Sequence, residues 1–438
     1  MDGRTGARAR NAGASATTQG SSAYAVYSLA FLTLISSFNY LDRAVLGLAL
    51  PLIKRELVVS DTALGLASGL AFALFYSLLG IPIAWLADRW SRRNIIAIGF
   101  AFWSLMTALT SFVGNIWELA AARFLMGAGE ASGLAPSTSM IADLFREPRR
   151  PLALAVFGIA SSLASLVLYP IAGWIGAHHG WRAMFVAGGL PGLVLALAFA
   201  LTVREPVRGS LEGQRTIVPL ASLAGSVRFL LGSRTYALIL AGSMFMGASV
   251  YAGSTWNATY LMRVHHLPLV AVAASIGPLQ GLCGGAGILL GGFLTDALGR
   301  RDPRWLLRLP AIACLFAAPA EALFLLGSGH AAWMSGFALM SFFALAHQAP
   351  VFAAAIGVAR VRMRAVAISM LVLVSGLLGQ IAGPLLVGVL DDRLHASLGD
   401  TDVRYSLLLV ALCQAAASLA FAAAIGRFVN DQQRAAAP

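Results

Sequence analysis

The chain has 438 residues, of which 58% are hydrophobic and only 11% are charged, and its formal net charge is +12. Soluble globular proteins carry about 25% charged residues, so the composition argues against a soluble enzyme. A basic balance of this size would suggest a nucleic-acid partner in a soluble protein, but here the basic residues stand in short segments between apolar runs. Apolar runs of about 20 residues are typical of membrane-spanning helices. We therefore expect a multi-pass protein whose surroundings are a lipid bilayer, with no nucleic-acid partner.

The first 22 residues differ from the rest of the chain. They are rich in Gly, Ala, Ser and Thr with a few arginines, which is typical of a flexible tail. The apolar run that follows is too long for the hydrophobic region of a signal peptide, so it is predicted to remain as the first membrane helix. Further along the chain, twelve apolar spans are predicted at about residues 24–50, 62–86, 94–114, 117–142, 152–175, 182–203, 236–262, 270–295, 305–326, 331–356, 365–390 and 405–427.

One connection is longer than the others and separates two sets of six spans. The predicted organisation is a flexible tail at 1–22, an N-terminal six-helix bundle at 23–203, a central loop at 204–235, a C-terminal six-helix bundle at 236–427 and a tail at 428–438. Within the loop, residues 216–231 are predicted to form an amphipathic helix on the membrane surface. Lys and Arg number 23 on the side of the N-terminus and 6 on the opposite side, so both termini and the central loop are predicted to be cytoplasmic.

The two halves share a short motif. "AWLADRWSRR" (residues 84–93) follows the second span, and "GFLTDALGRR" (residues 292–301) follows the eighth. Asp88 matches Asp296, and the arginine pair that follows matches at the same offset of 208 residues. The excess of positive charge on the cytoplasmic side explains the arginines, but it does not explain matched spacing in both halves. The motif resembles the signature loop of the major facilitator superfamily, although Ala84 and Ser91 stand where that signature has glycine.

This resemblance implies a fold and a gate. The fold class is expected to be an all-α membrane protein with twelve transmembrane helices in two pseudo-symmetric six-helix bundles, which rock about a central site. The signature loops are expected to form a cytoplasmic gate that includes Asp88, Arg89, Arg92, Arg93, Asp296, Arg300 and Arg301.

A narrower resemblance lies mainly in the N-terminal half. "RFLMGAGEASGLAPSTSMIADLF" (residues 123–145) is similar to the spinster branch, in which a G-x-G-E-A-S stretch precedes Ala-Pro and an I-A-D-x-F ending. "GWRAMFVAGGLPGLVLAL" (residues 180–197) and "REPVRG" (residues 204–209) resemble bacterial spinster-like proteins, whereas "FNYLDR" in the first span is shared with anion:cation symporters. The fifth span departs from the spinster pattern, because Ala, Ser and Leu stand where Pro and Gly are usual. The resemblance implies a lysolipid transporter in a bacterial inner membrane.

Ionisable residues inside the spans are few: Asp42, Arg43, Arg123, Glu130, Glu321 and His347. A charge at the centre of a bilayer costs at least about 2.5–3.5 kcal/mol unless it is paired or faces water, so these positions need a reason. Arg123 and Glu130 are seven residues apart and share a helix face, whereas the neighbours Asp42 and Arg43 point about 100° apart. We therefore predict a cross-helix cluster in which Asp42 or Arg43 meets Arg123 or Glu130.

Two interpretations of this cluster are open. In the first, buried salt bridges only fix the register of the helices. In the second, which we favour, an arginine that moves onto an anionic substrate releases a buried carboxylate to take a proton, because desolvation raises the pKa of a carboxyl group and a nearby arginine lowers it. Asp42 and Glu130 are then the proton-coupling residues, and Arg43 and Arg123 bind substrate. In spinsters and anion symporters, the family pattern gives matching roles to the positions of Asp42, Arg43 and Glu130.

The C-terminal half offers further candidates. Its predicted substrate-binding residues are Trp256, Asn257, Tyr260, His347 and Gln348, and Gln280 and Gln380 are additional candidates for the cavity wall. A lone histidine inside a span is more often a satisfied core residue than a ligand, and the roles of Glu321 and His347 stay open. The three cysteines lie within apolar runs and have neither disulfide nor metal-site spacing. We therefore expect no metal and no cofactor other than protons as the coupling ion.

The favoured function is a secondary transporter that works by alternating access. It would be proton-coupled and move an anionic amphiphile, such as a lysophospholipid or a sphingolipid phosphate; the alternative is a proton-coupled symporter of a soluble organic anion such as a sugar acid. A membrane-embedded enzyme would need a nucleophile with its base, or metal ligands, clustered at one interface, and the scattered histidines do not supply them. A primary pump would need a G-x-x-x-x-G-K-[ST] loop, which the sequence lacks. We expect the protein to act as a monomer.

Overall fold

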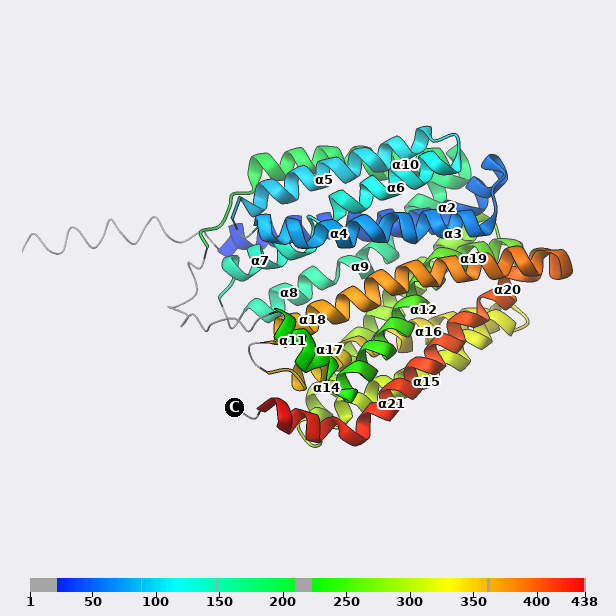
Figure 1. Ribbon diagram of the computed structural model, residues 1–438. Helices are drawn as coiled ribbons and strands as arrows, with labels where there is room; N and C mark the ends of the chain where they lie inside the picture. Colours follow the sequence, from blue (N-terminus) through cyan, green and yellow to red (C-terminus); the bar gives the residue numbers. More distant parts are fainter. Residues whose placement is uncertain (1–21, 88, 147–148, 209–222, 361–362, 437–438) are drawn as a thin grey trace, which may run out of the picture.

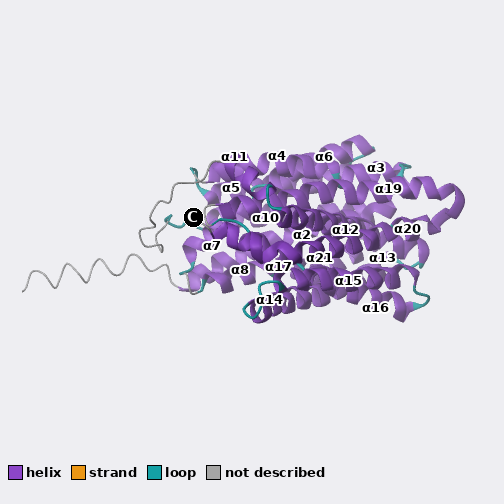
Figure 2. Ribbon diagram, turned by 60° about the horizontal axis from the view of Figure 1, so that its bottom comes forward, coloured by secondary structure: helices purple, strands orange, loops and turns teal. Residues whose placement is uncertain are grey.

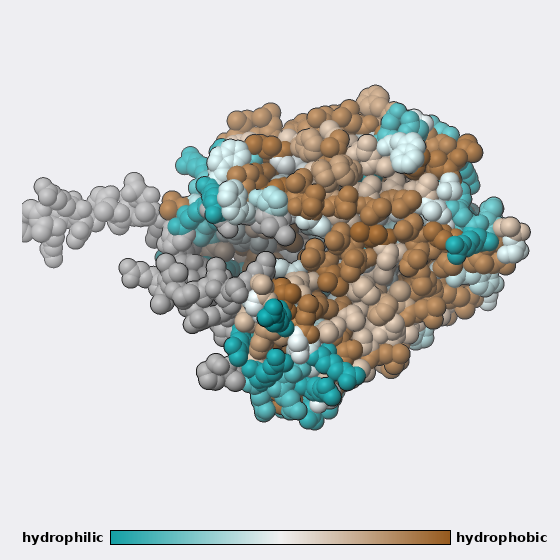
Figure 3. Space-filling view, viewed as in Figure 1, coloured by the Kyte–Doolittle hydropathy of each residue, from teal (hydrophilic) through white to brown (hydrophobic). Residues whose placement is uncertain are grey.

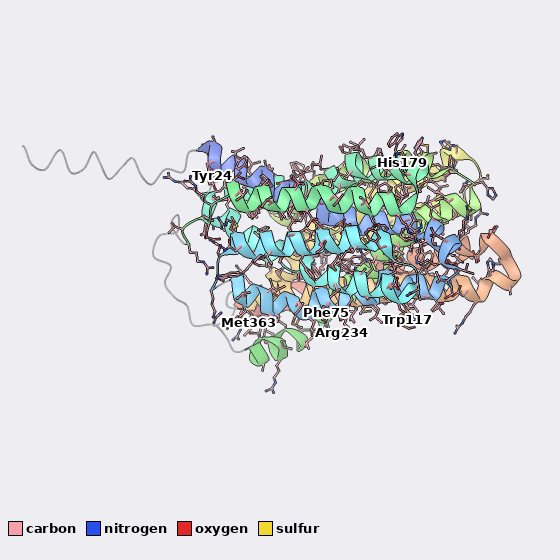
Figure 4. The ribbon with its side chains drawn as sticks, turned by 90° about the horizontal axis from the view of Figure 1, so that it is seen from above. Tyr24, Phe75, Trp117, His179, Arg234 and Met363 are labelled. Atoms are coloured by element: carbon pink, nitrogen blue, oxygen red, sulfur yellow. The ribbon has the colours of Figure 1, made fainter. Side chains whose placement is uncertain are left out.

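The computed structural model describes residues 22–87, 89–146, 149–208, 223–360 and 363–436 (Figure 1). Throughout these ranges the regular elements are helices (Figure 2). The two ends of the described chain, near residues 22 and 436, lie at the same end of the bundle (Figure 1), which we call the terminal end. Figure 4 shows Tyr24 and Met363 at this end, and Trp117 and His179 at the opposite, distal end. The path of the chain is therefore that of a helical bundle whose helices cross from end to end.

The N-terminal half contains the first six spans. They are formed by α2 (Ser22–Leu57), α3 (Asp61–Ser68) with α4 (Leu70–Ala87), α5 (Arg92–Leu109) with the 3-10 turn η1 (Thr110–Phe112), α6 (Ile116–Glu130) with α7 (Leu134–Leu144), and a long final segment of α8 (Arg150–Gly158), α9 (Ala160–Leu163), η2 (Ala164–Leu168) and α10 (Tyr169–Thr202). Gly180 divides α10 into the fifth and sixth spans, because its φ of 81° is a left-handed conformation that favours glycine.

The C-terminal half follows a short helix, α11 (Leu223–Leu231), which occupies the second half of the predicted amphipathic segment; residues 216–222 of that prediction lie outside the described residues. Its six spans are formed by α12 (Arg234–Val264), α13 (Leu269–Leu279) with η3 (Gln280–Gly284) and α14 (Gly285–Gly299), α15 (Trp305–Leu326), α16 (His330–Ala346) with α17 (Gln348–Gly357), α18 (Arg364–Leu373) with η5 (Val374–Leu378) and α19 (Gly379–Leu398), and η6 (Gly399–Thr401) with α20 (Asp402–Ser406) and α21 (Leu408–Ala436). The segments η2, η3 and η5 are single π-helical turns, and they lie in the fifth, eighth and eleventh spans.

Nine helical stretches of the described chain are long and apolar enough to cross a membrane. Two of them, at residues 152–202 and 366–436, each contain two of the expected spans, and α6 with α7 supplies the remaining one. An apolar surface extends across the middle of the molecule, with hydrophilic residues at its ends (Figure 3). The predicted fold of twelve transmembrane helices in two six-helix bundles is therefore confirmed.

Local signals in the sequence explain where several helices begin. The side chains of Ser60, Asn115 and Ser233 accept hydrogen bonds from backbone N–H groups three residues later and so cap α3, α6 and α12. Such caps satisfy donors that have no partner within the helix. Each cap stands in a connection between apolar spans, so the loop residues themselves determine the start of the next span.

The two halves meet mainly toward the distal end. Helix α2 packs against α12, α3 packs against α19, and α10 packs against α13. One apolar cluster runs across this contact from Leu48 and Leu64 to Trp256, whereas a second, around Phe100 and Phe199, belongs to the N-terminal half alone. The halves are thus joined by a continuous apolar core at one end of the molecule.

Candidate functional site

The central feature of the N-terminal half is an ion pair between Arg43 of α2 and Glu130 of α6. Glu130 Oε2 accepts hydrogen bonds from Arg43 Nε at 2.9 Å and from Asn39 Nδ2 at 2.8 Å, and Arg43 Nη2 lies 2.9 Å from the same oxygen. The Glu130 side chain is fully buried, whereas the Arg43 side chain keeps 21% of its surface exposed. Arg43 therefore stands between a buried carboxylate and the accessible interior, and this is one of the cross-helix pairs that the sequence predicted.

Asp42 and Arg123 complete a group of four ionisable side chains, which we call the interior charge cluster. Asp42 is buried, lies beside Thr107 of α5, and its Oδ1 is 3.5 Å from the position of a Cβ built on Gly188 of α10. It thus points into the N-terminal half, away from the direction taken by Arg43. Arg123 is also buried, and its Nη1 lies 2.9 Å from Met126 Sδ. Among the described residues, neither Asp42 nor Arg123 forms an ion pair within 4.0 Å, although both lie within electrostatic range of Glu130.

Close packing of α6 on α4 brings the cluster together. A Cβ at Gly127 would lie 2.5 Å from the carbonyl oxygen of Phe72, so only glycine permits this approach. Arg123 precedes Gly127 by one helical turn, and its guanidinium carbon lies 4.8 Å from the centre of the Phe72 ring. The guanidinium carbon of Arg43 lies 4.9 Å from the same ring. Phe72 therefore contacts both cations, and cation–π attraction stabilises each of them in a largely buried site.

Tyrosines surround Arg43 on its accessible side. The Arg43 guanidinium carbon is 5.0 Å from the centre of the Tyr76 ring, and Tyr40 and Tyr251 are close enough to interact with its charge. Tyr40 is 44% exposed. Tyr251 belongs to α12, so the surroundings of Arg43 include a side chain from the C-terminal half. These tyrosines were not predicted from the sequence, because an aromatic residue inside an apolar span carries no cost that would mark it.

The predicted C-terminal residues on α12 have partners within their own half. The Trp256 indole is buried and donates to the carbonyl oxygen of Pro384 at 3.0 Å, and the Tyr260 hydroxyl donates to the carbonyl oxygens of Phe324 and Leu325. Asn257 is also buried, and its Oδ1 has no hydrogen-bond partner among the described residues. Asn257 is therefore the member of this set with unused hydrogen-bonding capacity.

The other predicted residues of the C-terminal half are dispersed. His347 Nδ1 lies 2.5 Å from the carbonyl oxygen of Ala344, and Gln348, at the start of α17, is exposed. Glu321 is fully buried on α15, and both of its oxygens lack a hydrogen-bond partner in the described chain. Gln280 is exposed and Gln380 is buried. The structure does not bring these side chains together with the interior charge cluster in one site, and their proposed roles stay predictions.

An ion-pair network joins the two halves at the distal end. Arg263 at the end of α12 donates from Nη2 to Asp61 Oδ1 at 2.7 Å and from Nη1 to Asp61 Oδ2 at 3.0 Å. Lys54 Nζ lies 2.5 Å from the same carboxylate. Asp392 of α19 accepts hydrogen bonds from the backbone N–H groups of Asp61 and Thr62, at 3.0 and 2.8 Å. Residues of the C-terminal half thus hold both the side chain and the first turn of α3.

The backbones at this point are nearly in contact. A Cβ at Gly388 of α19 would lie 2.4 Å from the carbonyl oxygen of Asp61, so glycine is required for the observed distance between α19 and α3. Sequence reasoning missed this network, because Asp61, Arg263 and Asp392 stand at the ends of spans, where charged residues are ordinary. The available signal was that Asp61 begins a helix and that two adjacent aspartates end the eleventh span.

The signature loops behave differently at the terminal end. Asp88 lies outside the described residues. Arg92 is buried and donates to Asp143 of the N-terminal half at 2.6 Å and to Glu205, at the start of the central loop, at 2.8 Å. Arg89 stacks on Trp85 of the preceding helix, α4. Arg93, also of the first loop, lies against Asn94. In the second loop Asp296, Arg300 and Arg301 are exposed. None of the contacts observed for these residues in the described ranges crosses between the halves.

Within the described residues no group of three or more His, Cys, Asp or Glu side chains is placed to hold a metal ion. The arrangement instead provides two charged centres, one buried in the N-terminal half and one between the halves.

Two helical bundles that meet at one end and contain buried charges indicate a membrane transporter, and the similarity of the chain to known proteins supports this class. A family model described as Major Facilitator Superfamily matches residues 32–384. The chain belongs to the major facilitator superfamily, whose members are transporters. An "MFS-type efflux pump" of Mycolicibacterium smegmatis is 32% identical over 401 residues, which cover 91% of this chain and 92% of that protein.

Other relatives include two kinds of transporter. "Protein spinster homolog 1" of Xenopus tropicalis is 29% identical over 400 residues, covering 85% of this chain and 74% of that protein. A "probable galactarate/D-glucarate transporter" of Bacillus subtilis is 28% identical over 291 residues, covering 61% and 64%. Among solved structures, a bacterial homologue of the human lysosomal transporter spinster, in an inward-facing and unoccupied conformation, superposes with a TM-score of 0.85 at 25% identity, covering 94% of this chain and 99% of that one. The predicted resemblance to the spinster branch is therefore confirmed.

Proposed function

We propose that this chain is a proton-coupled secondary transporter of an anionic amphiphile of the lysophospholipid class. In the proposed orientation the terminal end is cytoplasmic, as the distribution of Lys and Arg predicts, and the molecule is inward-facing. Two observations support this conformation: the contacts between halves concentrate at the distal end, and the structural relative with a TM-score of 0.85 is inward-facing.

The observation that carries the proposal is the position of Arg43. Its guanidinium pairs with the buried Glu130 on one side and keeps part of its surface open on the other. A guanidinium binds carboxylates and phosphates with paired hydrogen bonds, so an anionic group that enters the interior competes with Glu130 for the same cation. Arg43 is therefore the proposed substrate anchor, and Arg123, which lies behind Phe72, supports the positive potential of the site.

Proton coupling follows from this competition. Glu130 is fully buried, and its Oε1 already lacks a hydrogen-bond partner in the described chain. If the substrate draws Arg43 away, Glu130 retains only Asn39 as a hydrogen-bond donor, and an unpaired buried carboxylate costs several kcal/mol unless it takes a proton. Asp42 is buried beside Thr107 and is the second proposed proton-binding group. Binding of an anion and binding of a proton are thereby linked.

The surroundings of Arg43 favour an amphiphile over a small polar anion. Phe72 and Tyr76 pack on the guanidinium. Among the predicted residues of the C-terminal half, Trp256 and Tyr260 already donate their hydrogen bonds to backbone carbonyl oxygens. A small, highly hydroxylated anion needs hydrogen-bond partners on all sides, because unpaired polar groups lower affinity. A single anionic head with an apolar chain needs partners only at its head. The relatives that cover most of the chain include spinster homologues, which agrees with this choice.

A soluble organic anion is the second candidate. It is favoured by the relatives named as galactarate/D-glucarate transporters and by the unused Oδ1 of the buried Asn257. Such a substrate would use Arg43 in the same way, so the two candidates differ in what binds the rest of the molecule.

A series of lysophospholipids with increasing acyl length distinguishes the two. In proteoliposomes under an imposed pH gradient, we expect affinity to rise with chain length until the apolar surface is filled, because each buried methylene contributes about 0.8 kcal/mol. Arg43→Ala should weaken the whole series by a similar factor, since it removes the contact with the head and leaves the contact with the chain. Arg393→Ala, which removes an exposed arginine at the distal end, is the matched control and should leave transport unchanged. A response that is flat with chain length, combined with competition by galactarate, would instead identify a soluble-anion symporter.

A further inference from the structure

A groove of about 350 Å³ opens toward the terminal end of the C-terminal half, between the first turns of α12 and the second half of α21. Arg234, Thr235 and Leu238 of α12 line it on one side, and Ala423, Gly426 and Arg427 of α21 line it on the other. The interior charge cluster lies in the other half, so the groove is separate from the proposed transport site. Hydrophilic residues gather over this end of the C-terminal half, around the ends of α14 and α21 (Figure 3).

The charged groups of the groove favour an anion. Arg234 (labelled in Figure 4) and Arg427 are both exposed, and no ion pair of either is observed with the residues that the structure describes. The nearby carboxylate of Asp431 accepts hydrogen bonds from Ser233 Oγ at 2.8 Å and from the Thr235 backbone N–H at 3.4 Å, so it serves the first turn of α12. Even with Asp431 included, the three charged side chains sum to +1.

Thr235 lies beside these arginines but presents no free donor to the groove. Its side chain is fully buried and lies against the Asp431 carboxylate. The groove thus offers two guanidiniums to a group that carries several acceptor oxygens, as a phosphate does.

The order of residues along both walls indicates a lipid. On α12, Leu238 lies one turn beyond Arg234, in the direction of the membrane interior, and on α21, Ala423 lies one turn before Arg427. The two helices run in opposite directions, and the contacts of Asp431 with Ser233 and Thr235 place Arg234 about one turn nearer the terminal end than Arg427. Arg427 is therefore about level with Leu238, and Ala423 lies one turn deeper. A free anion would use only the two arginines, whereas a phospholipid would place its phosphate between them and the start of an acyl chain against Leu238 and Ala423.

We propose that the groove between Arg234 and Arg427 binds the head of an anionic phospholipid of the leaflet at the terminal end. The bound lipid is a component of the bilayer and is not the transported substrate. Basic grooves between transmembrane helices on the cytoplasmic side are suited to such lipids, and each arginine near an anionic headgroup contributes about fivefold in affinity.

Native mass spectrometry of the full chain in detergent tests the proposal. Phosphatidylglycerol and phosphatidylcholine with identical acyl chains are added separately, and we expect preferential retention of phosphatidylglycerol. Arg234→Ala and Arg427→Ala should each weaken that binding about fivefold, and the lysine substitutions should restore most of it. Arg393→Ala, an equal loss of charge at the distal end, is the control and should change nothing. Equal retention of the two lipids, or unchanged binding in the double alanine variant, would overturn the proposal.

Two further arms separate the possible sources of a signal. Inorganic phosphate at millimolar concentration should not displace phosphatidylglycerol from the wild-type protein; if it does, the groove is a site for a free anion and the lipid assignment is wrong. Arg43→Ala should keep phosphatidylglycerol binding while losing transport. If Arg43→Ala abolishes lipid retention, the lipid was bound at the transport site, and the groove proposal fails even though the proposed function survives. If Arg43→Ala loses transport but keeps phosphatidylglycerol, and transport does not depend on the acyl length of the lysolipid, the groove proposal survives and the proposed lysolipid substrate is wrong.

Discussion

Asp61→Asn is expected to open the distal end of the transporter. In the structure Asp61 accepts two hydrogen bonds from Arg263 across the halves and one from Lys54 within its own half. Lys54 belongs to the same half as Asp61, so among the contacts of the Asp61 side chain only the one with Arg263 must break when the halves separate. Hydrogen bonds to charged groups contribute about 1.5–3 kcal/mol. Because asparagine keeps one acceptor oxygen and Asp392 still caps α3, we expect a loss of about 2 kcal/mol, which shifts the conformational equilibrium about 30-fold.

Double electron–electron resonance measures this shift. Spin labels at Trp117 and Ser397, exposed positions at the distal ends of the two halves, report their separation in a background without the native cysteines. A conformation with an open distal end that is about 1% populated in the wild type would rise to about a quarter of the molecules. Glu56→Gln is the matched control, because Glu56 pairs with Arg182 at the same end but within one half. Unchanged distances in Asp61→Asn, or an equal change in Glu56→Gln, would refute the assignment of Asp61 to a contact that holds the halves closed.

Other substitutions test the remaining parts of the structure. Glu130→Gln and Asp42→Asn should reduce the response of transport to a pH gradient more than they reduce substrate binding, because each removes a buried acid. A fluorescent assay of proton uptake in liposomes measures this response. Unchanged proton uptake in both variants would favour a structural role for these two residues. Gly388→Ala should open the distal end as Asp61→Asn does, since a Cβ there would lie 2.4 Å from the Asp61 carbonyl oxygen; the same labels would show a closed end if this reasoning is wrong. Arg92→Ala should lower the free energy of unfolding by about 3 kcal/mol, because it leaves two carboxylates without their buried guanidinium; an unaltered thermal midpoint would contradict that estimate.

The sequence was most informative where a residue is costly in a membrane. Arg43 and Glu130 could be identified because a charge inside an apolar span requires a partner, and the angle between Arg43 and Asp42 followed from helix geometry. In the structure Arg43 forms an ion pair with Glu130, and Asp42 points toward Thr107 and Gly188. The sequence could not choose among the possible cross-helix pairs, because that choice depends on the close approach of α6 to α4.

The distal contact was not predictable from the sequence for a different reason. Asp61 and Arg263 are 202 residues apart, and each occupies a span end where solvent-exposed charges are common. Their pairing depends on how closely α3 and α19 pack, which is a property of the tertiary structure. The matched signature loops had the opposite outcome: their repeat was clear in the sequence, yet Arg92 is buried in ion pairs while Arg300 is exposed. Equal motifs therefore occupy unequal surroundings in the two halves.

The π-helical turns in the fifth, eighth and eleventh spans have a consequence for how the chain tolerates change in length. Each turn contains one residue more than an α-helix would use, so the segments before and after it are out of phase by about 100°. Deleting one residue from η3 or η5 would restore a regular helix and rotate everything beyond it by that angle. Gln380 follows η5 and is buried, and its backbone carbonyl oxygen lies close to Gly69 between α3 and α4; it would then exchange its place with an apolar neighbour. The polarity of the interface between the halves is therefore encoded in the position of a single surplus residue as well as in the identity of the side chains.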